Sequence, residues 1–184
     1  GDDVRDDQRN RGDLYSMARH FKNKADTMLN EENSLKLREI MSSLRQVKKT
    51  EELTLMINAI DYTCLAQKEL MKKLKPGMYE YEAEAIIEYV FRKNGSESPG
   101  FPSILGGGEN SCILHYTSNR RCLKDGDLLV CDIGAEYHNY TADITRTMPV
   151  NGKFTEEQKI IYNIVLEAQE AGILACKEGN KFWE

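Results

Sequence analysis

The fold is decided by the stretch Leu128-Leu129-Val130-Cys131-Asp132-Ile133-Gly134, which turns through Tyr137 and His138 and returns as Ala142-Asp143-Ile144-Thr145-Arg146-Thr147. The continuous apolar run before Asp132 predicts a strand that is covered on both faces. A turn centred between Tyr137 and His138 would pair the two segments as a hairpin. In that register Asp132 and Asp143 lie directly opposite each other, with Cβ atoms roughly 4.5–5.5 Å apart.

Two facing carboxylates in a covered hairpin repel each other, and a cation between them removes that repulsion. Paired metal ions in hydrolytic sites lie about 3.5–4 Å apart, a distance that two facing carboxylates can span. Thr145 lies two residues after Asp143 and points to the same face, so its hydroxyl could orient a carboxylate. The alternative is structural: an Asp near a turn often bonds only backbone N–H groups, and Thr is common in strands.

Composition limits the classes of protein that this chain can belong to. The chain has 184 residues, a formal charge of −5 and 40% hydrophobic residues, which suits one soluble domain, or one domain with an extension. Its mild acidity argues against a nucleic-acid or anionic membrane partner. No apolar run approaches the roughly 18 residues that a membrane span needs.

The N-terminal residues and the cysteines indicate the compartment. Gly1-Asp2-Asp3-Val4-Arg5 does not have the pattern of a signal peptide. The chain has five cysteines, an odd number, without a CxxC pair. Scattered free thiols of this kind are typical of a cytoplasmic protein, and a disulfide or zinc framework is less favoured.

Helical periodicity dominates the chain as far as Gly95. Apolar residues recur at helical spacing in four segments: residues 14–28, 35–44, 50–74 and 82–94. We expect the apolar stripes of the last two segments to be core faces. A capping box at Thr155 and Gln158 predicts a further helix to about Cys176, with Ile160, Ile161, Ile164, Val165, Ala168 and Ile173 on one side.

Between the helical segments the chain has short β-like pieces. Phe101–Leu105 is a predicted strand, and we expect Gly106-Gly107-Gly108 to form a flexible loop beside a site. This order predicts an α+β fold with an antiparallel sheet covered by helices. Residues 1–44 are expected to be the end of an N-terminal domain or a linker, and residues 45–184 the main domain.

The candidate ligands favour a hard cation. Carboxylate oxygens suit Mn²⁺ or Mg²⁺, and Co²⁺ or Zn²⁺ become possible if an imidazole joins them. His115 follows an apolar segment and could line the same pocket as the aspartates, although a lone His is more often structural. His138 is expected at the hairpin tip, pointing outward.

Three segments together resemble one enzyme family. They are Leu114-His115-Tyr116, then Lys124-x-Gly126-Asp127-Leu128-x-x-x-Asp132-x-Gly134-Ala135, and Tyr140-x-Ala142-Asp143-Ile144-Thr145-Arg146-Thr147. This pattern resembles the metallopeptidases that include Xaa-Pro aminopeptidases, prolidases and methionine aminopeptidases, and most closely the Xaa-Pro aminopeptidases. The similarity extends over roughly residues 44–184 and is much weaker before them.

The resemblance implies a pita-bread fold, of which residues 45–184 would form the first half. It implies that Asp132 and Asp143 are two of five ligands to two divalent ions, with Mn expected and Co or Zn possible, and that His115 contacts the substrate. The family reaction is attack by a hydroxide that bridges the two metals on the peptide bond before proline. The implied partner is a peptide with proline at its second position, and we also expect a homo-oligomer.

The family's remaining His and two Glu ligands have no matching motif here, and neither Glu178 nor Glu184 is assigned. We therefore expect the chain alone to be an inactive fragment with an incomplete metal site. The alternatives are a prolidase or creatinase-like hydrolase, a non-catalytic peptide-binding paralogue, and a structural Ca²⁺ or Mg²⁺ site on the hairpin.

Overall fold

The computed structural model of the protein describes residues 31–181. The predicted helix at residues 14–28 and Glu184 lie outside the described residues. The chain divides into two compact units between Lys49 and Thr50, and each unit is considered by itself. Among the described residues, none of the helices has the length and apolar character that crossing a membrane requires.

The first unit contributes helix α2, Glu31–Gln46. It contains the predicted segment 35–44 and extends it at both ends. Leu35, Leu37, Ile40 and Leu44 are all more than half exposed within the described residues. Helical spacing thus identified the helix correctly.

The second unit begins with two helices, α3 (Thr50–Lys73) and α4 (Glu80–Lys93). Acidic residues lie in the first turn of each helix and lysine or arginine in the last turn, which suits the helix dipole. Prediction of the α4 core face is confirmed, since Ala83, Ile87, Val90 and Phe91 are buried.

The predicted core face of α3 is wrong for most of its residues, although Leu74, directly after the helix, packs against the core. Leu53, Ile57, Ile60 and Met71 are at least 40% exposed. The buried face consists of small and polar residues together with one leucine: Ala59, Thr63, Ala66, Gln67 and Leu70. Small side chains let the helix lie close to the strands. Thr63 and Gln67 form hydrogen bonds with the strand backbone. Which face of α3 is buried therefore depends on the strands opposite it more than on its own hydrophobicity.

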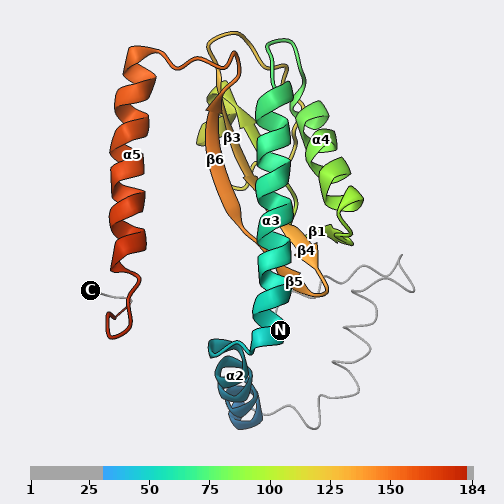
Figure 1. Ribbon diagram of the computed structural model, residues 1–184, viewed down its shortest axis with the longest axis vertical. Coiled ribbons are helices and arrows are strands. Elements are labelled where there is room, and N and C mark those ends of the chain that lie inside the picture. Colours follow the sequence, from blue (N-terminus) through green and yellow to red (C-terminus); the bar gives the residue numbers. More distant parts are fainter. Residues whose placement is uncertain (1–30, 182–184) are drawn as a thin grey trace. The chain divides into compact units, whose positions relative to one another are not determined.

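The strands form two small antiparallel sheets, which confirms the predicted fold class (Figure 1). One sheet has the order β2-β3-β6, with β2 at Ile104–Gly107, β3 at Leu128–Ile133 and β6 at Ile144–Pro149. The other has the order β1-β4-β5, with β1 at Ser98–Pro99, β4 at Ala135–Tyr137 and β5 at Tyr140–Thr141. Helix α3 contacts β4, β5 and β6, while α4 contacts β1 and β2.

Strand β3 has one buried face and one half-buried face, so the prediction that it is covered on both faces is wrong for the described residues. Leu129, Cys131 and Ile133 are fully buried and join the core with Leu70, Ile87 and Phe91. Leu128, Val130 and Asp132 alternate with them and are only half-buried. Asp132 therefore lies on the less covered face of the strand.

The hairpin register also differs from the prediction. The pairs Asp132–Thr145 and Tyr137–Tyr140 show that the turn is centred between His138 and Asn139, one residue later than expected. Both turn residues have positive φ, 49° and 68°. Such φ values are typical of a tight two-residue hairpin turn, in which Asn is common. Asp143 consequently lies diagonal to Asp132 instead of directly opposite.

Gly106 and Gly107 are buried rather than part of a flexible loop, and Gly108 is half-buried. Gly106 and Gly107 end β2, and the predicted strand at Phe101–Leu105 is thus shifted toward the C-terminus. Gly108 has φ +55° and begins the 3₁₀ turn η1 (Gly108–Cys112). A Cβ at Gly107 would overlap the Leu123 side chain, so glycine is required here for close approach.

The helix α5, Glu156–Ala175, begins as predicted with a capping box at Thr155 and Gln158. Its apolar residues do not form a core face within the described part of the chain. None of its residues is buried, and Ile160, Ile161, Val165 and Ile173 are each about 60% exposed or more. The period of an apolar stripe predicts a helix, but burial also requires a surface opposite it.

Gly134 is the position where the hairpin tolerates no side chain, because an added Cβ would overlap the carbonyl oxygen of Ala142. We expect Gly134→Ala to lower the free energy of unfolding by at least about 3 kcal/mol, measured by urea denaturation. Gly172→Ala in α5 is the control, because nothing lies within 4 Å of a Cβ there. That control should be neutral or slightly stabilising, and a tolerated Gly134→Ala would contradict the packing described.

Candidate metal centre

Asp132 is positioned by the pairing of β3 with β6. It lies opposite Thr145 in the register. The Thr145 hydroxyl donates a hydrogen bond of 2.8 Å to Oδ1 of Asp132. The carboxylate that Thr145 orients is therefore Asp132. This bond leaves Oδ2 of Asp132 for another partner.

Asp143 lies between β5 and β6 and is exposed. Although the two aspartates are diagonal and not opposite, their carboxyl groups are near enough for Asp132 to affect the pKa of Asp143. Desolvation and then the charge and hydrogen bonding of Asp132 raise the pKa of Asp143. The structure thus brings the two predicted carboxylates together, by a different register from the one expected.

Two buried polar side chains of α3 brace the hairpin beside these aspartates. The Gln67 amide donates to the carbonyl oxygens of Cys131 and Ile144, at 3.1 and 3.0 Å. The Thr63 hydroxyl accepts from the Ala135 N–H at 2.9 Å and donates to Ala59 at 2.7 Å. The three strand residues bonded in this way, Cys131, Ile144 and Ala135, are close neighbours of Asp132 or Asp143 in the chain.

Sequence reasoning missed Thr63 and Gln67. The signal was present: polar residues four apart, one helical turn, lie between Ala59 and Leu70 on a helix otherwise rich in apolar residues. A polar side chain that must be buried needs a hydrogen-bond partner, and strand carbonyls supply one.

The histidines are placed differently. His115 lies on an exposed turn after η1, with a left-handed backbone of φ 53°, and makes no hydrogen bond or ion pair with either aspartate among the described interactions. The structure therefore does not bring His115 into contact with the carboxylates. His138 is at the hairpin tip with a 58% exposed side chain, as predicted, and its Nδ1 lies 3.9 Å from Glu97.

The residues present fit part of a metal site. Two adjacent carboxylates on a braced hairpin supply oxygen donors of the kind that hard divalent cations prefer. Within residues 31–181, no cluster of three or more His, Cys, Asp or Glu side chains is arranged to hold a metal ion. Asp132 and Asp143 are thus the described candidates for ligands, and further donors would be needed for tight binding.

The comparison with protein families identifies the chain. The description "Metallopeptidase family M24" matches residues 54–184. This chain belongs to the metallopeptidase family M24. Among its relatives, Xaa-Pro aminopeptidase of Escherichia coli is 43% identical over 147 residues, covering 80% of this chain and 33% of the relative. Xaa-Pro dipeptidase of Pyrococcus furiosus is 36% identical over 165 residues, covering 90% of this chain and 46% of the relative.

Solved structures agree with this membership. Zinc-substituted E. coli aminopeptidase P in complex with product has a TM-score of 0.69 and 47% identity, over 70% of this chain and 29% of that one. Proline aminopeptidase P II from Yersinia pestis has a TM-score of 0.74 and 38% identity, over 88% of this chain and 39% of that one. The chain therefore has part of the pita-bread fold, and it spans between a third and a half of the length of the two relatives above.

Removal of one charge tests whether the two carboxylates repel each other. We expect Asp143→Asn to stabilise the metal-free protein near neutral pH by less than about 1 kcal/mol, since Asp143 is exposed and water screens the repulsion. The sign follows from the raised pKa, because a group whose pKa rises on folding opposes folding when it is charged. Thermal unfolding in a chelator measures the effect.

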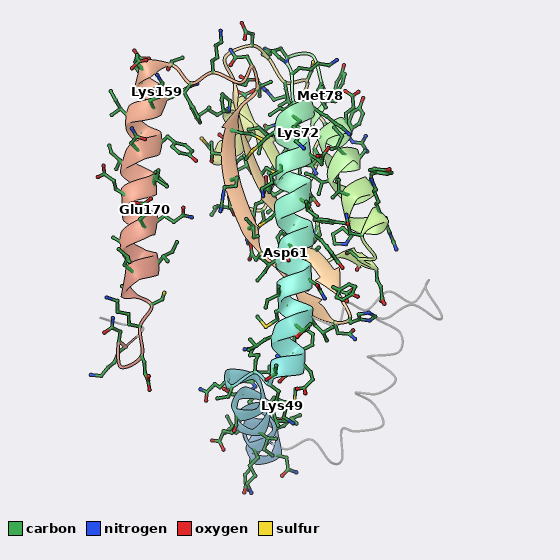
Figure 2. All side chains as sticks on the ribbon, in the orientation of Figure 1. Lys49, Asp61, Lys72, Met78, Lys159 and Glu170 are labelled. Carbon is green, nitrogen blue, oxygen red and sulfur yellow. The ribbon has the colours of Figure 1, made fainter. Side chains whose placement is uncertain are left out.

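The control for this change is Asp61→Asn, which removes an exposed charge from α3 at the position labelled in Figure 2. Asp61 is not among the groups that shift the pKa of Asp143. The Asp61 variant should unfold at the temperature of the unchanged protein. An Asp143 variant that unfolds at a lower temperature without metal would show that its carboxylate stabilises the hairpin instead.

Proposed function

We propose that the protein containing this sequence is a dinuclear metallopeptidase that releases an N-terminal residue linked to proline. The observation that carries the proposal is the pair Asp132–Asp143, held together on a hairpin that α3 braces. Supporting it, the chain is 43% identical over 147 residues to an Xaa-Pro aminopeptidase. The chain spans 33% of that relative's length, so the activity is proposed for the whole protein and not for these residues alone.

In this proposal each site residue has a separate role. Asp132 and Asp143 hold the metal ions through carboxylate oxygens, while Thr145 fixes the orientation of the Asp132 carboxylate. His115 contacts the substrate from the exposed turn after η1. When bound, two divalent ions supply Lewis acidity toward the peptide carbonyl and lower the pKa of water.

The metal and the compartment belong to the same proposal. Oxygen donors favour manganese, and cobalt or zinc would suit a site that a histidine completes. One solved relative is described as zinc-substituted, so zinc is an appropriate comparison metal. The cysteines at 64, 112, 122, 131 and 176 are all free thiols, which favours a reducing, cytoplasmic location.

A second candidate is an Xaa-Pro dipeptidase, because a relative of that name matches 90% of the chain. An aminopeptidase cleaves the bond before proline in longer peptides, whereas a dipeptidase is restricted to two-residue substrates. Parallel assays of the whole protein on an Xaa-Pro dipeptide and on an Xaa-Pro-Xaa tripeptide separate the two. We expect cleavage of the tripeptide, and activity confined to the dipeptide would favour the dipeptidase.

Calorimetric titration of the chain with Mn²⁺ tests the ligand assignment. We expect weak binding by the unchanged chain and no detectable binding by Asp132→Asn or Asp143→Asn, because each variant replaces a charged oxygen donor. Thr145→Val should weaken binding by roughly tenfold, since it removes only the orienting hydrogen bond. Asp125→Asn, at an exposed turn outside the pair, is the control and should bind as the unchanged chain does. Binding that survives both Asp variants would refute the assignment.

The same chain tests the expected incompleteness of the site. With only two aspartates as candidate ligands among the described residues, we expect no measurable cleavage of Xaa-Pro peptides by residues 1–184 at saturating Mn²⁺. Peptide hydrolysis followed by chromatography provides the measurement, and the whole protein under identical conditions is the positive control. Sustained turnover by the short chain would contradict the two-ligand description.

A further inference from the structure

Glu80 is a fully buried carboxylate that the proposed chemistry does not use. It is the first residue of α4 and has no solvent exposure. Burying a charge is strongly unfavourable unless hydrogen bonds replace its lost hydration. Its hydrogen-bond partners should therefore reveal why a carboxylate is present at this position.

The Glu80 carboxylate accepts four hydrogen bonds, and all four donors come from one segment, residues 107–121. Oε1 accepts from the Gly107 N–H at 2.8 Å and from the Asn110 amide at 3.2 Å. Oε2 accepts from the Tyr116 hydroxyl at 2.7 Å and from the Arg121 N–H at 2.9 Å. Helix α4 thus holds both ends and the middle of the connection that leaves β2.

This anchored segment contains His115. Asn110 donates to the Tyr116 hydroxyl at 2.9 Å, so one residue before His115 and one after it bond each other as well as Glu80. His115 itself is exposed and has φ 53°. A left-handed backbone at a non-glycine residue is strained and persists only where its surroundings impose it.

The contacts of Tyr116 connect the residue after His115 to the buried carboxylate. The Tyr116 hydroxyl donates a hydrogen bond to the buried Glu80 carboxylate. This bond restrains the Tyr116 side chain and, through it, the peptide between His115 and Tyr116. Burial of that hydroxyl and its bond to Glu80 raise the pKa of Tyr116, so it remains a donor at physiological pH. Arg120 also donates through its N–H to the Tyr116 hydroxyl, at 3.5 Å.

We propose that Glu80 is a positioning residue, which sets the backbone of the segment 107–121 and thereby presents His115 in its left-handed conformation. That this presentation serves a peptide substrate rests on the proposed function. That Glu80 imposes the conformation rests on the hydrogen bonds alone. The competing explanation is that Glu80 only favours the N-terminus of α4 through its charge.

The test is Glu80→Gln in the metal-free chain. Glutamine keeps the side-chain shape but has one acceptor oxygen, so in either orientation its NH₂ group faces the N–H of Gly107 or of Arg121. We expect one of these two amides to exchange with deuterium at least about tenfold faster. The coupling constant between the amide and α protons of His115, which reports φ, should also change.

The matched control is Glu82→Gln on the same first turn of α4. Glu82 accepts from the Tyr79 N–H at 2.7 Å and belongs to the capping box, but bonds nothing in the segment 107–121. It should loosen the start of α4 and leave the His115 coupling constant unchanged. If Glu82→Gln shifts that coupling as much as Glu80→Gln does, the helix-terminus explanation holds and the proposal fails.

Tyr116→Phe keeps the test decisive if Glu80→Gln does not fold. It removes the link nearest to His115 and leaves the bonds of Glu80 to Gly107 and Arg121 in place. We expect a changed His115 coupling with protected Gly107 and Arg121 amides. An unchanged His115 coupling in this variant overturns the proposal.

The result of the Glu80 test can be distinguished from the result of the test of the proposed function. Manganese titration of the same samples reports on Asp132 and Asp143, which do not contact Glu80 in the described interactions. If the unchanged chain binds no manganese, the metallopeptidase proposal is contradicted. The His115 measurement would still decide the role of Glu80.

Discussion

The pair of hydrogen bonds from the Gln67 amide to Cys131 and Ile144 ties β3 to β6 at the point where the two strands part. The last pair of that ladder is Ile133–Ile144, and the chain then crosses to the second sheet through Gly134. Without a brace at this point, two adjacent like charges would tend to open the hairpin. The candidate metal centre depends on this attachment of α3 together with the pairing of β3 and β6, because both fix the backbone that carries the two carboxylates.

Much of the fold and of the site could be predicted from the sequence. The positions of α4 and α5, the capping box at Thr155 and the proximity of Asp132 and Asp143 all follow from local patterns. The register could not be obtained in the same way. It depended on which two residues accept positive φ, and the pair His138–Asn139 was preferred to Tyr137–His138 because Asn tolerates the left-handed region well. A one-residue error in the turn centre shifted Asp143 to a diagonal position.

Burial was the other property that local patterns predicted poorly. On α3 the apolar Ile57 and Met71 are exposed, while Thr63 and Gln67 are buried. Periodicity detects that a helix has two faces, but the identity of the inward face depends on the surface opposite. The face of α3 that lies close to the strands needs alanine and hydrogen-bonding residues. The more hydrophobic face of the helix is therefore the exposed one. The same limit explains α5, whose regular apolar stripe remains exposed in the described residues.

Two unfavourable features lie where the proposed chemistry occurs, and a buried polar side chain from a helix supports each of these two. The repulsion between Asp132 and Asp143 is countered from α3 by Gln67, and the left-handed backbone of His115 is countered from α4 by Glu80. Neither support is visible as an apolar pattern, and both are costly to bury without partners. An apolar residue is usually more favourable than a polar one on the inward face of a helix. A polar residue at such a position therefore indicates a distant segment that it holds in a strained or repulsive arrangement.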